Sequence, residues 1–106
     1  MSTEELFQEA SILVQNLEKK PTNNELLKLY GLYKQSKVGD LKEKSTNFFN
    51  PKARMKAESW EQQKGKTRED AMTEYTEFVV ELIQKYNNWF IRLKIFYKWN
   101  TILGKK

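Results

Sequence analysis

The spacing of the apolar residues is the feature that most constrains the fold of this chain. Apolar side chains recur at three- and four-residue steps in four separate segments, and none of these segments alternates as a half-buried strand does. The clearest run consists of Ala71, Met72, Tyr75, Phe78, Val79, Leu82, Ile83 and Tyr86. This period places the side chains on one face of an α-helix of roughly five turns. The sequence therefore predicts an all-α fold.

Prolines, glycines and capping residues set the ends of the predicted helices. The first helix runs from Thr3 to Leu17 and is closed by Pro21, and the second follows a cap at Asn23 or Asn24. The predicted helices cover residues 3–17, 24–37, 51–64 and 68–86. Residues 41–50 have no clear period and predict a long loop, with Phe48 and Phe49 packed on the core. We expect residues 1–86 to form one four-helix bundle.

Missing residue types and net charge limit the function. The chain of 106 residues contains no cysteine and no histidine, so it lacks thiolate nucleophiles, disulfides, the usual zinc ligands and the usual general base. We predict no catalytic residues, no metal site and no cofactor. The net charge of +5 favours an anionic partner, which charge alone does not identify. The N-terminus lacks the apolar run of a signal peptide, and we expect a cytoplasmic protein.

A cluster of phenols and an ammonium group is predicted on the second helix. Tyr30, Tyr33 and Lys34 stand at positions i, i+3 and i+4, which share one face. Phenol rings can stack on a purine, while their hydroxyls and a lysine can bind phosphate. Aromatic residues at helical spacing more often belong to a core, so this cluster alone does not establish a nucleotide site.

Two longer strings resemble the acyl-CoA-binding protein family. Residues 30–40, YGLYKQSKVGD, resemble its Y-x-x-Y-K-Q-A-x-x-G-D signature. Residues 57–75, AESWEQQKGKTREDAMTEY, resemble its W-x-A-W-x-x-x-K-G-x-x-x-E-D-A-M-x-x-Y block, with Ala57 in place of the first tryptophan. The two strings keep the separation found in the family, and the resemblance spans about residues 4–86 without a gap.

The resemblance implies both a fold and a ligand. The family fold is a four-helix bundle in an up-down-down-up arrangement, and the implied ligand is long-chain acyl-CoA. Residues matching the family's site fall into three groups. Tyr30, Lys34 and Lys56 would hold the 3′-phosphate of coenzyme A, Tyr33 and Tyr75 would line the adenine and pantetheine part, and Lys20 would approach the adenine. Leu26, Leu27, Ser11 and Val14 would border the acyl groove. Gln15 stands where the family often has a lysine.

These observations favour a non-catalytic, monomeric carrier that buffers and transports fatty acyl-CoA for lipid metabolism. An alternative is a small basic helical module that contacts anionic membrane or nucleic acid. The lysines are spread over the chain and no recognition-helix or RNA-binding motif is present, so we expect no nucleic-acid partner.

Residues 87–106 differ from the rest of the chain. They are rich in Trp, Phe, Ile and Lys and contain no acidic residue. We expect an additional C-terminal amphipathic helix that makes peripheral contact with an anionic membrane. Two other interpretations are that this helix folds back over the bundle or mediates self-association.

Overall fold

The structure is a computed structural model that describes residues 2–42 and 50–86. Its elements are α1 (Thr3–Leu13), the short 3-10 helix η1 (Val14–Asn16), α2 (Asn23–Lys37), α3 (Pro51–Glu61) and α4 (Arg68–Tyr86). The described residues form no strand, and the all-α prediction is confirmed. None of the helices in these ranges is long and apolar enough to cross a membrane. The expectations for Phe48, Phe49 and residues 87–106 lie outside the described part.

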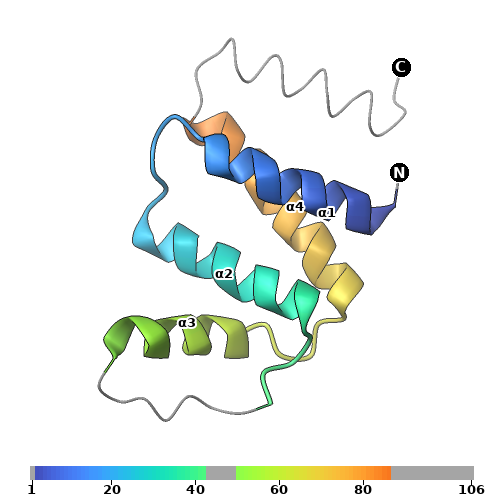
Figure 1. Ribbon diagram of the computed structural model, residues 1–106, viewed down its shortest axis with the longest axis vertical. Coiled ribbons are helices and arrows are strands. Elements are labelled where there is room, and N and C mark those ends of the chain that lie inside the picture. Colours follow the sequence, from blue (N-terminus) through green and yellow to red (C-terminus); the bar gives the residue numbers. More distant parts are fainter. Residues whose placement is uncertain (1, 43–49, 87–106) are drawn as a thin grey trace.

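The four α-helices have the up-down-down-up arrangement. Figure 1 shows α2 and α3 side by side and running in the same direction, whereas α1 and α4 run in the opposite direction. Parallel neighbours cannot be joined by a tight turn, because the chain must return along the full length of the helix. The connection between Lys37 and Pro51 must therefore be long enough to return from the end of α2 to the start of α3.

Side-chain caps set the helix ends, and the predicted cap of α2 and the predicted end of the first helix were wrong. Thr22, not Asn23 or Asn24, caps α2: its hydroxyl accepts from the amide of Glu25, whose carboxylate accepts from the Thr22 amide. The first α-helix ends at Leu13 rather than Leu17. The side-chain amides of Gln15 and Asn16 donate to carbonyls in the last turn of α1, so these carbonyls keep partners where the α-helix stops.

The boundary between α3 and α4 contains a turn. The third helix ends at Glu61, three residues before the predicted end, and residues 62–65 form a turn. Thr67 caps α4, because its hydroxyl accepts from the amide of Asp70.

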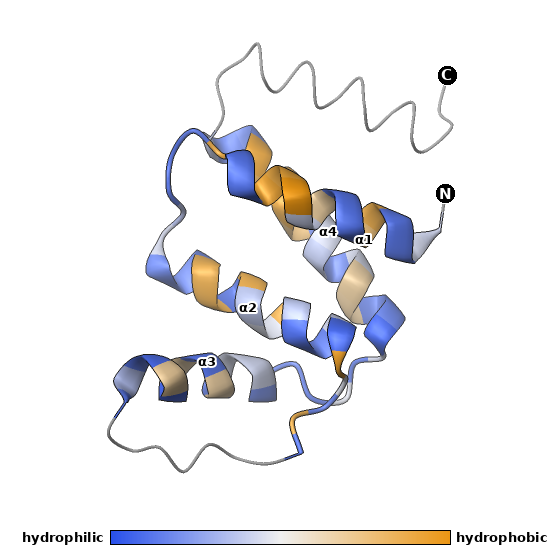
Figure 2. Ribbon diagram, viewed as in Figure 1, coloured by the Kyte–Doolittle hydropathy of each residue, from blue (hydrophilic) through white to orange (hydrophobic). Residues whose placement is uncertain are grey.

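The hydrophobic core is built by α1, α2 and α4. Its buried residues are Phe7, Ala10, Leu29, Leu32, Met72, Tyr75, Val79, Leu82 and Ile83. In Figure 2 the hydrophobic side of α1 and that of α4 face each other, while α3 is mostly hydrophilic. The buried residue of α3 is Ser59, which is polar. Helix α3 therefore lies outside the core and packs mainly on α2.

A glycine sets how closely α3 approaches α2. A Cβ atom added to Gly31 would lie 2.4 Å from the carbonyl oxygen of Ser59, which is well inside contact distance. No side chain fits between the two backbones at this point. Gly31 and Ser59 thus mark the close contact of α2 and α3. The residues that precede Gly31 in α2 and Ser59 in α3 border a pocket.

Polar contacts attach the end of α2 to the turn between α3 and α4. The buried Gln35 amide donates to the Asp40 carboxylate and to the Lys66 carbonyl, both at 2.8 Å. The same Asp40 oxygen accepts from the Gly65 amide at 2.9 Å. This amide and the Gln35 side chain hold the pKa of Asp40 below its usual value. Trp60 adds a 2.8 Å hydrogen bond from its indole nitrogen to the Gly39 carbonyl.

A second set of contacts joins the start of α2 to the end of α4. The Glu25 carboxylate accepts from the Tyr86 hydroxyl and, at 3.0 Å, from the Lys85 ammonium. The hydrogen bond from Tyr86, followed by the backbone amide of Thr22, lowers the pKa of Glu25 to about 2. Glu25 is therefore ionised at neutral pH, and it fixes the direction of α2 where that helix begins.

Candidate ligand-binding site

A pocket of about 460 Å³ lies between the first halves of α2 and α3. It is lined by Asn23, Leu26, Leu27, Tyr30, Lys52, Met55 and Lys56. The volume falls in the range of small-molecule sites, roughly 300–1,000 Å³. Four of the ten predicted site residues, Leu26, Leu27, Tyr30 and Lys56, line this pocket.

The polar end of this pocket is a phenol beside an ammonium group. The Lys56 ammonium lies 5.4 Å from the centre of the Tyr30 ring, within the range of a cation–π contact. The contact holds a positive charge of α3 against a phenol ring of α2. Both groups can donate hydrogen bonds to a single anion that binds between the two helices.

Lys34 lies one helical turn after Tyr30 and also faces α3. Its ammonium lies 5.3 Å from the ring centre of Trp60, which the contact with Gly39 holds in place. Trp60 is half-buried and lies outside the main core. Tyr30, Lys34 and Lys56 therefore lie together along the α2–α3 contact instead of pointing to separate sides of the molecule.

Tyr33 faces the other neighbours of α2. Its ring lies 5.5 Å from that of Phe7 in α1 and 6.0 Å from that of Tyr75 in α4, and the Phe7 and Tyr75 rings are 5.0 Å apart. Burial, with the neighbouring Tyr33, raises the pKa of Tyr75 to about 12. Tyr75 is therefore a neutral hydrogen-bond donor at neutral pH. This cluster leaves Tyr33 partly exposed and Tyr75 buried.

The three remaining predicted residues are not among those that line the pocket. Ser11 donates its hydroxyl to the carbonyl of Gln8 at 2.6 Å within α1. Val14, in η1, is partly buried against the core. Lys20 is exposed in the segment between η1 and α2. The structure thus places these residues on the α1 side of α2, outside the α2–α3 pocket.

Three residues that line the pocket were missing from the sequence analysis. Asn23 was considered only as a cap, and Lys52 and Met55 were assigned to a helix without a site role. The parallel arrangement of α2 and α3 explains why such residues lie at the pocket. Once Tyr30 is placed opposite Lys56, residues one turn earlier in both helices must also face each other.

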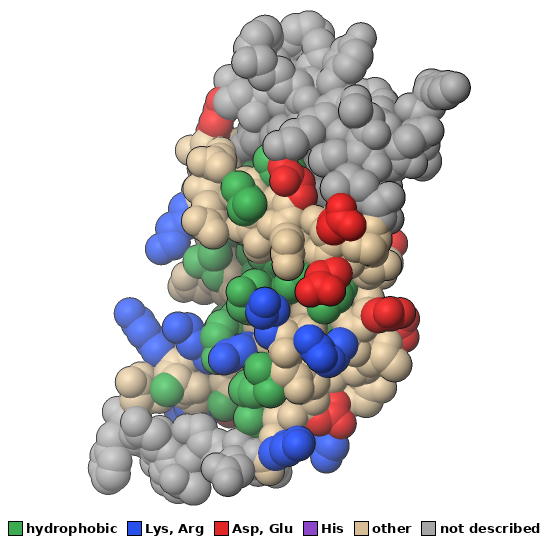
Figure 3. All heavy atoms as spheres, turned by 45° about the vertical axis from the view of Figure 1, so that its right-hand side comes forward, with side chains coloured by type: hydrophobic (Ala, Val, Ile, Leu, Met, Phe, Trp, Pro, Cys, Tyr) green, Lys and Arg blue, Asp and Glu red, His purple; other side chains and the backbone are tan. Residues whose placement is uncertain are grey.

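Charge is distributed unevenly over the bundle. Helices α2 and α3 carry six Lys or Arg and three Glu, whereas α1 and α4 carry two basic and eight acidic residues. Figure 3 shows blue side chains gathered around green ones in the lower half of the molecule, with red side chains above and to the right. The basic half contains the pocket. This polarity favours an anionic ligand that has an apolar portion.

An apolar pocket edged by lysines and a phenol, between two parallel helices of a small bundle, defines a class of binding protein for amphipathic anions. A family described as acyl-CoA-binding protein matches residues 4–79. The chain belongs to the acyl-CoA-binding protein family.

Individual relatives agree with this assignment. Acyl-CoA-binding protein 2 of Saccharomyces pastorianus is 49% identical over 84 residues, which are 79% of this chain and 97% of the relative. The acyl-CoA-binding protein of Saccharomyces cerevisiae is 48% identical over the same shares of both chains. The crystal structure of Oryza sativa acyl-CoA-binding protein 2 superposes with a TM-score of 0.75 at 34% identity, covering 79% of this chain and 93% of the other. The corresponding structure from Moniliophthora perniciosa gives a TM-score of 0.78 at 29% identity, with coverage of 90% and 92%.

Proposed function

We propose that this protein binds long-chain fatty acyl-CoA esters between α2 and α3 and acts as their carrier. The observation that carries the proposal is the α2–α3 pocket, in which Leu26, Leu27 and Met55 adjoin the Tyr30–Lys56 pair. An acyl-CoA ester has the matching combination of a phosphorylated nucleotide and an apolar chain. The names of the relatives support the same ligand. The comparisons give no support to the alternative of a general basic interaction module.

Each part of the site has a proposed role. Tyr30, Lys34 and Lys56 bind the 3′-phosphate, and Tyr33 and Tyr75 border the adenine and pantetheine portion. The neutral Tyr75 hydroxyl would serve as a donor there. Leu26 and Leu27 contact the acyl chain in the α2–α3 pocket, and Ser11 and Val14, which lie outside that pocket, would contact the chain where it extends toward α1. Lys20 approaches the adenine from the segment before α2.

The energetics favour an ester with a long acyl chain over free coenzyme A. Charge-assisted hydrogen bonds to phosphate contribute roughly 1.5–3 kcal/mol each. Each methylene group removed from water adds about 0.8 kcal/mol. A partly buried long chain therefore contributes as much as the phosphate contacts or more, and affinity rises with chain length.

We infer that the protein carries its ligand without changing it. Activating a thioester for hydrolysis usually requires a nucleophile or general base such as Cys or His, and the sequence contains neither. The described residues contain no group of three His, Cys, Asp or Glu side chains placed to hold a metal ion. We propose a cytoplasmic, monomeric carrier without a cofactor. A peripheral contact of residues 87–106 with anionic membrane is a further proposal that rests on composition alone.

Calorimetry with three ligands tests the proposed function. Palmitoyl-CoA should bind at least about a hundredfold more tightly than free coenzyme A, because burial of only four methylene groups already supplies such a difference. A short oligonucleotide of matched charge should not compete. Equal affinities for the two coenzyme A compounds would contradict the role of the apolar pocket. Tight binding of the oligonucleotide alone would instead favour the nucleic-acid interpretation.

A further inference from the structure

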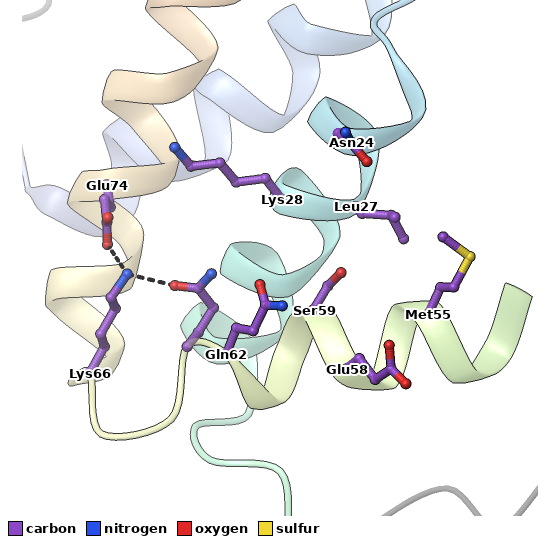
Figure 4. A pocket seen from close by; sticks show the side chains of 10 residues that line it. Asn24, Leu27, Lys28, Met55, Glu58, Ser59, Gln62, Lys66 and Glu74 are labelled. Atoms are coloured by element: carbon purple, nitrogen blue, oxygen red, sulfur yellow. Dashed lines mark hydrogen bonds and ion pairs between the residues drawn. The ribbon is translucent and has the colours of Figure 1, made fainter.

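A second pocket lies on the other side of the α2–α3 contact. It has a volume of about 470 Å³ and is bounded by α2, α3, the turn that follows α3, and α4. Figure 4 shows Lys28 and Asn24 reaching it from α2, Ser59 from α3, and Gln62 from the turn that follows α3. It faces α4, whereas the pocket assigned to acyl-CoA contains no residue of α4.

The two pockets adjoin through two side chains. Leu27 and Met55 line both of them, and in Figure 4 they project toward each other from the facing helices. Both stand one turn before the close contact of Gly31 with Ser59. Met55 is 44% exposed and has an unbranched thioether side chain, which can change rotamer at little cost. An alkyl chain in the first pocket can therefore extend between these two residues into the second.

The second pocket offers hydrogen bonds where the first offers apolar surface. Lys28, Asn24, Ser59 and Gln62 supply ammonium, amide and hydroxyl groups. The Lys28 ammonium is held toward α4, 4.3 Å from the centre of the Phe78 ring. A tail that ends in a methyl group gains little from such partners, whereas a tail that ends in a polar group keeps its hydrogen bonds on leaving water.

The charges of this pocket select among polar groups. Its two lysines, Lys28 and Lys66, are balanced by two carboxylates, Glu58 and Glu74. Lys66 is already engaged, at 2.6 Å from Glu74 and 2.5 Å from the Gln63 side chain. A neutral hydroxyl group fits such a balanced lining better than a carboxylate, which would approach Glu58 and Glu74.

We propose that the second pocket accepts the far end of an acyl chain bearing a terminal hydroxyl group, so that the protein binds ω-hydroxyacyl-CoA as well as the unmodified ester. This proposal rests on the proposed function, because it requires the acyl chain to lie between α2 and α3. The chain passes Leu27 and Met55, and its hydroxyl group exchanges hydrogen bonds with Gln62, Lys28 and their neighbours.

The test compares palmitoyl-CoA with 16-hydroxypalmitoyl-CoA by calorimetry on the full chain. In a wholly apolar groove an unpartnered hydroxyl weakens binding by roughly tenfold or more. We expect the two affinities to agree within about threefold, because the hydroxyl regains partners in this pocket. A tenfold preference for palmitoyl-CoA would overturn the proposal while leaving the proposed function intact. Absence of palmitoyl-CoA binding would overturn both.

A double variant tests whether the second pocket binds the terminal hydroxyl group. Lys28→Met with Gln62→Leu keeps side-chain volume but removes two polar groups, both from exposed residues. It should weaken the binding of 16-hydroxypalmitoyl-CoA by roughly tenfold and leave the affinity for palmitoyl-CoA unchanged. Unchanged binding of palmitoyl-CoA would also show that the variant is folded. The matched control is Gln8→Leu, an exposed glutamine on α1, and it should change neither affinity. An equal effect of the double variant on both ligands would overturn the proposal.

Discussion

Replacement of both Lys34 and Lys56 by alanine is expected to weaken palmitoyl-CoA binding by roughly a hundredfold or more. Each ammonium group would lose a charge-assisted contact with the same phosphate, worth roughly 1.5–3 kcal/mol, and 1.4 kcal/mol corresponds to a tenfold change in affinity. Each lysine stands over an aromatic ring along the α2–α3 contact, and the rings hold both charges near the pocket. Calorimetric titration measures the loss.

A matched variant separates local contacts from net charge. Lys37→Ala with Arg54→Ala removes two positive charges from the same two helices, and neither residue lines the pocket. The affinity of this variant for palmitoyl-CoA should stay within about threefold of that of the original protein, because exposed charges act weakly through water at physiological salt. An equal loss in both double variants would show that general attraction, and not a built phosphate site, governs binding.

The Gly31→Ala variant is expected to be less stable than the original protein, although alanine is the better helix former. Helix propensity alone favours alanine by about 0.8–1 kcal/mol. The added Cβ would lie 2.4 Å from the Ser59 carbonyl oxygen, and the backbones must move apart to accept it. Such overpacking typically costs about 1–3 kcal/mol. Urea unfolding should therefore show a net loss, and separation of α2 from α3 should also weaken palmitoyl-CoA binding.

Thr73→Ala is the control for this variant. Thr73 is exposed on α4, so the substitution changes helix propensity without an added contact, and the protein should be slightly stabilised. Equal stabilisation by Gly31→Ala would mean that α2 and α3 can separate freely. That result would contradict the role of Gly31 in setting their spacing.

Apolar periodicity was enough to predict the helices but not their neighbours. Spacing identifies the face of a helix that is buried, and it placed all nine core residues in helical segments that the structure contains. It could not show that α3 lies outside the core, because that position follows from the missing Cβ of Gly31 and from hydrogen bonds such as that of Trp60. The end of α1 depended on side-chain amides that no period reveals.

The motif shared with the family divides into two parts with different physical roles. Tyr30 and Lys34 face α3 beside the pocket, whereas Gln35 and Asp40 join the end of α2 to the turn before α4. Tyr33, although on a neighbouring position of the same helix, contacts Phe7 and Tyr75. A helical wheel groups Tyr30, Tyr33 and Lys34 on one face, but three different helices surround that face. Only the packing of the bundle assigns each side chain to its neighbour.

A crystal structure of the protein with palmitoyl-CoA would show directly where the ligand binds. We expect the 3′-phosphate within hydrogen-bond distance of Tyr30, Lys34 and Lys56, with the acyl chain against Leu26 and Leu27. A ligand bound on the acidic side of the bundle, between α1 and α4 and away from these residues, would contradict the proposed site between α2 and α3.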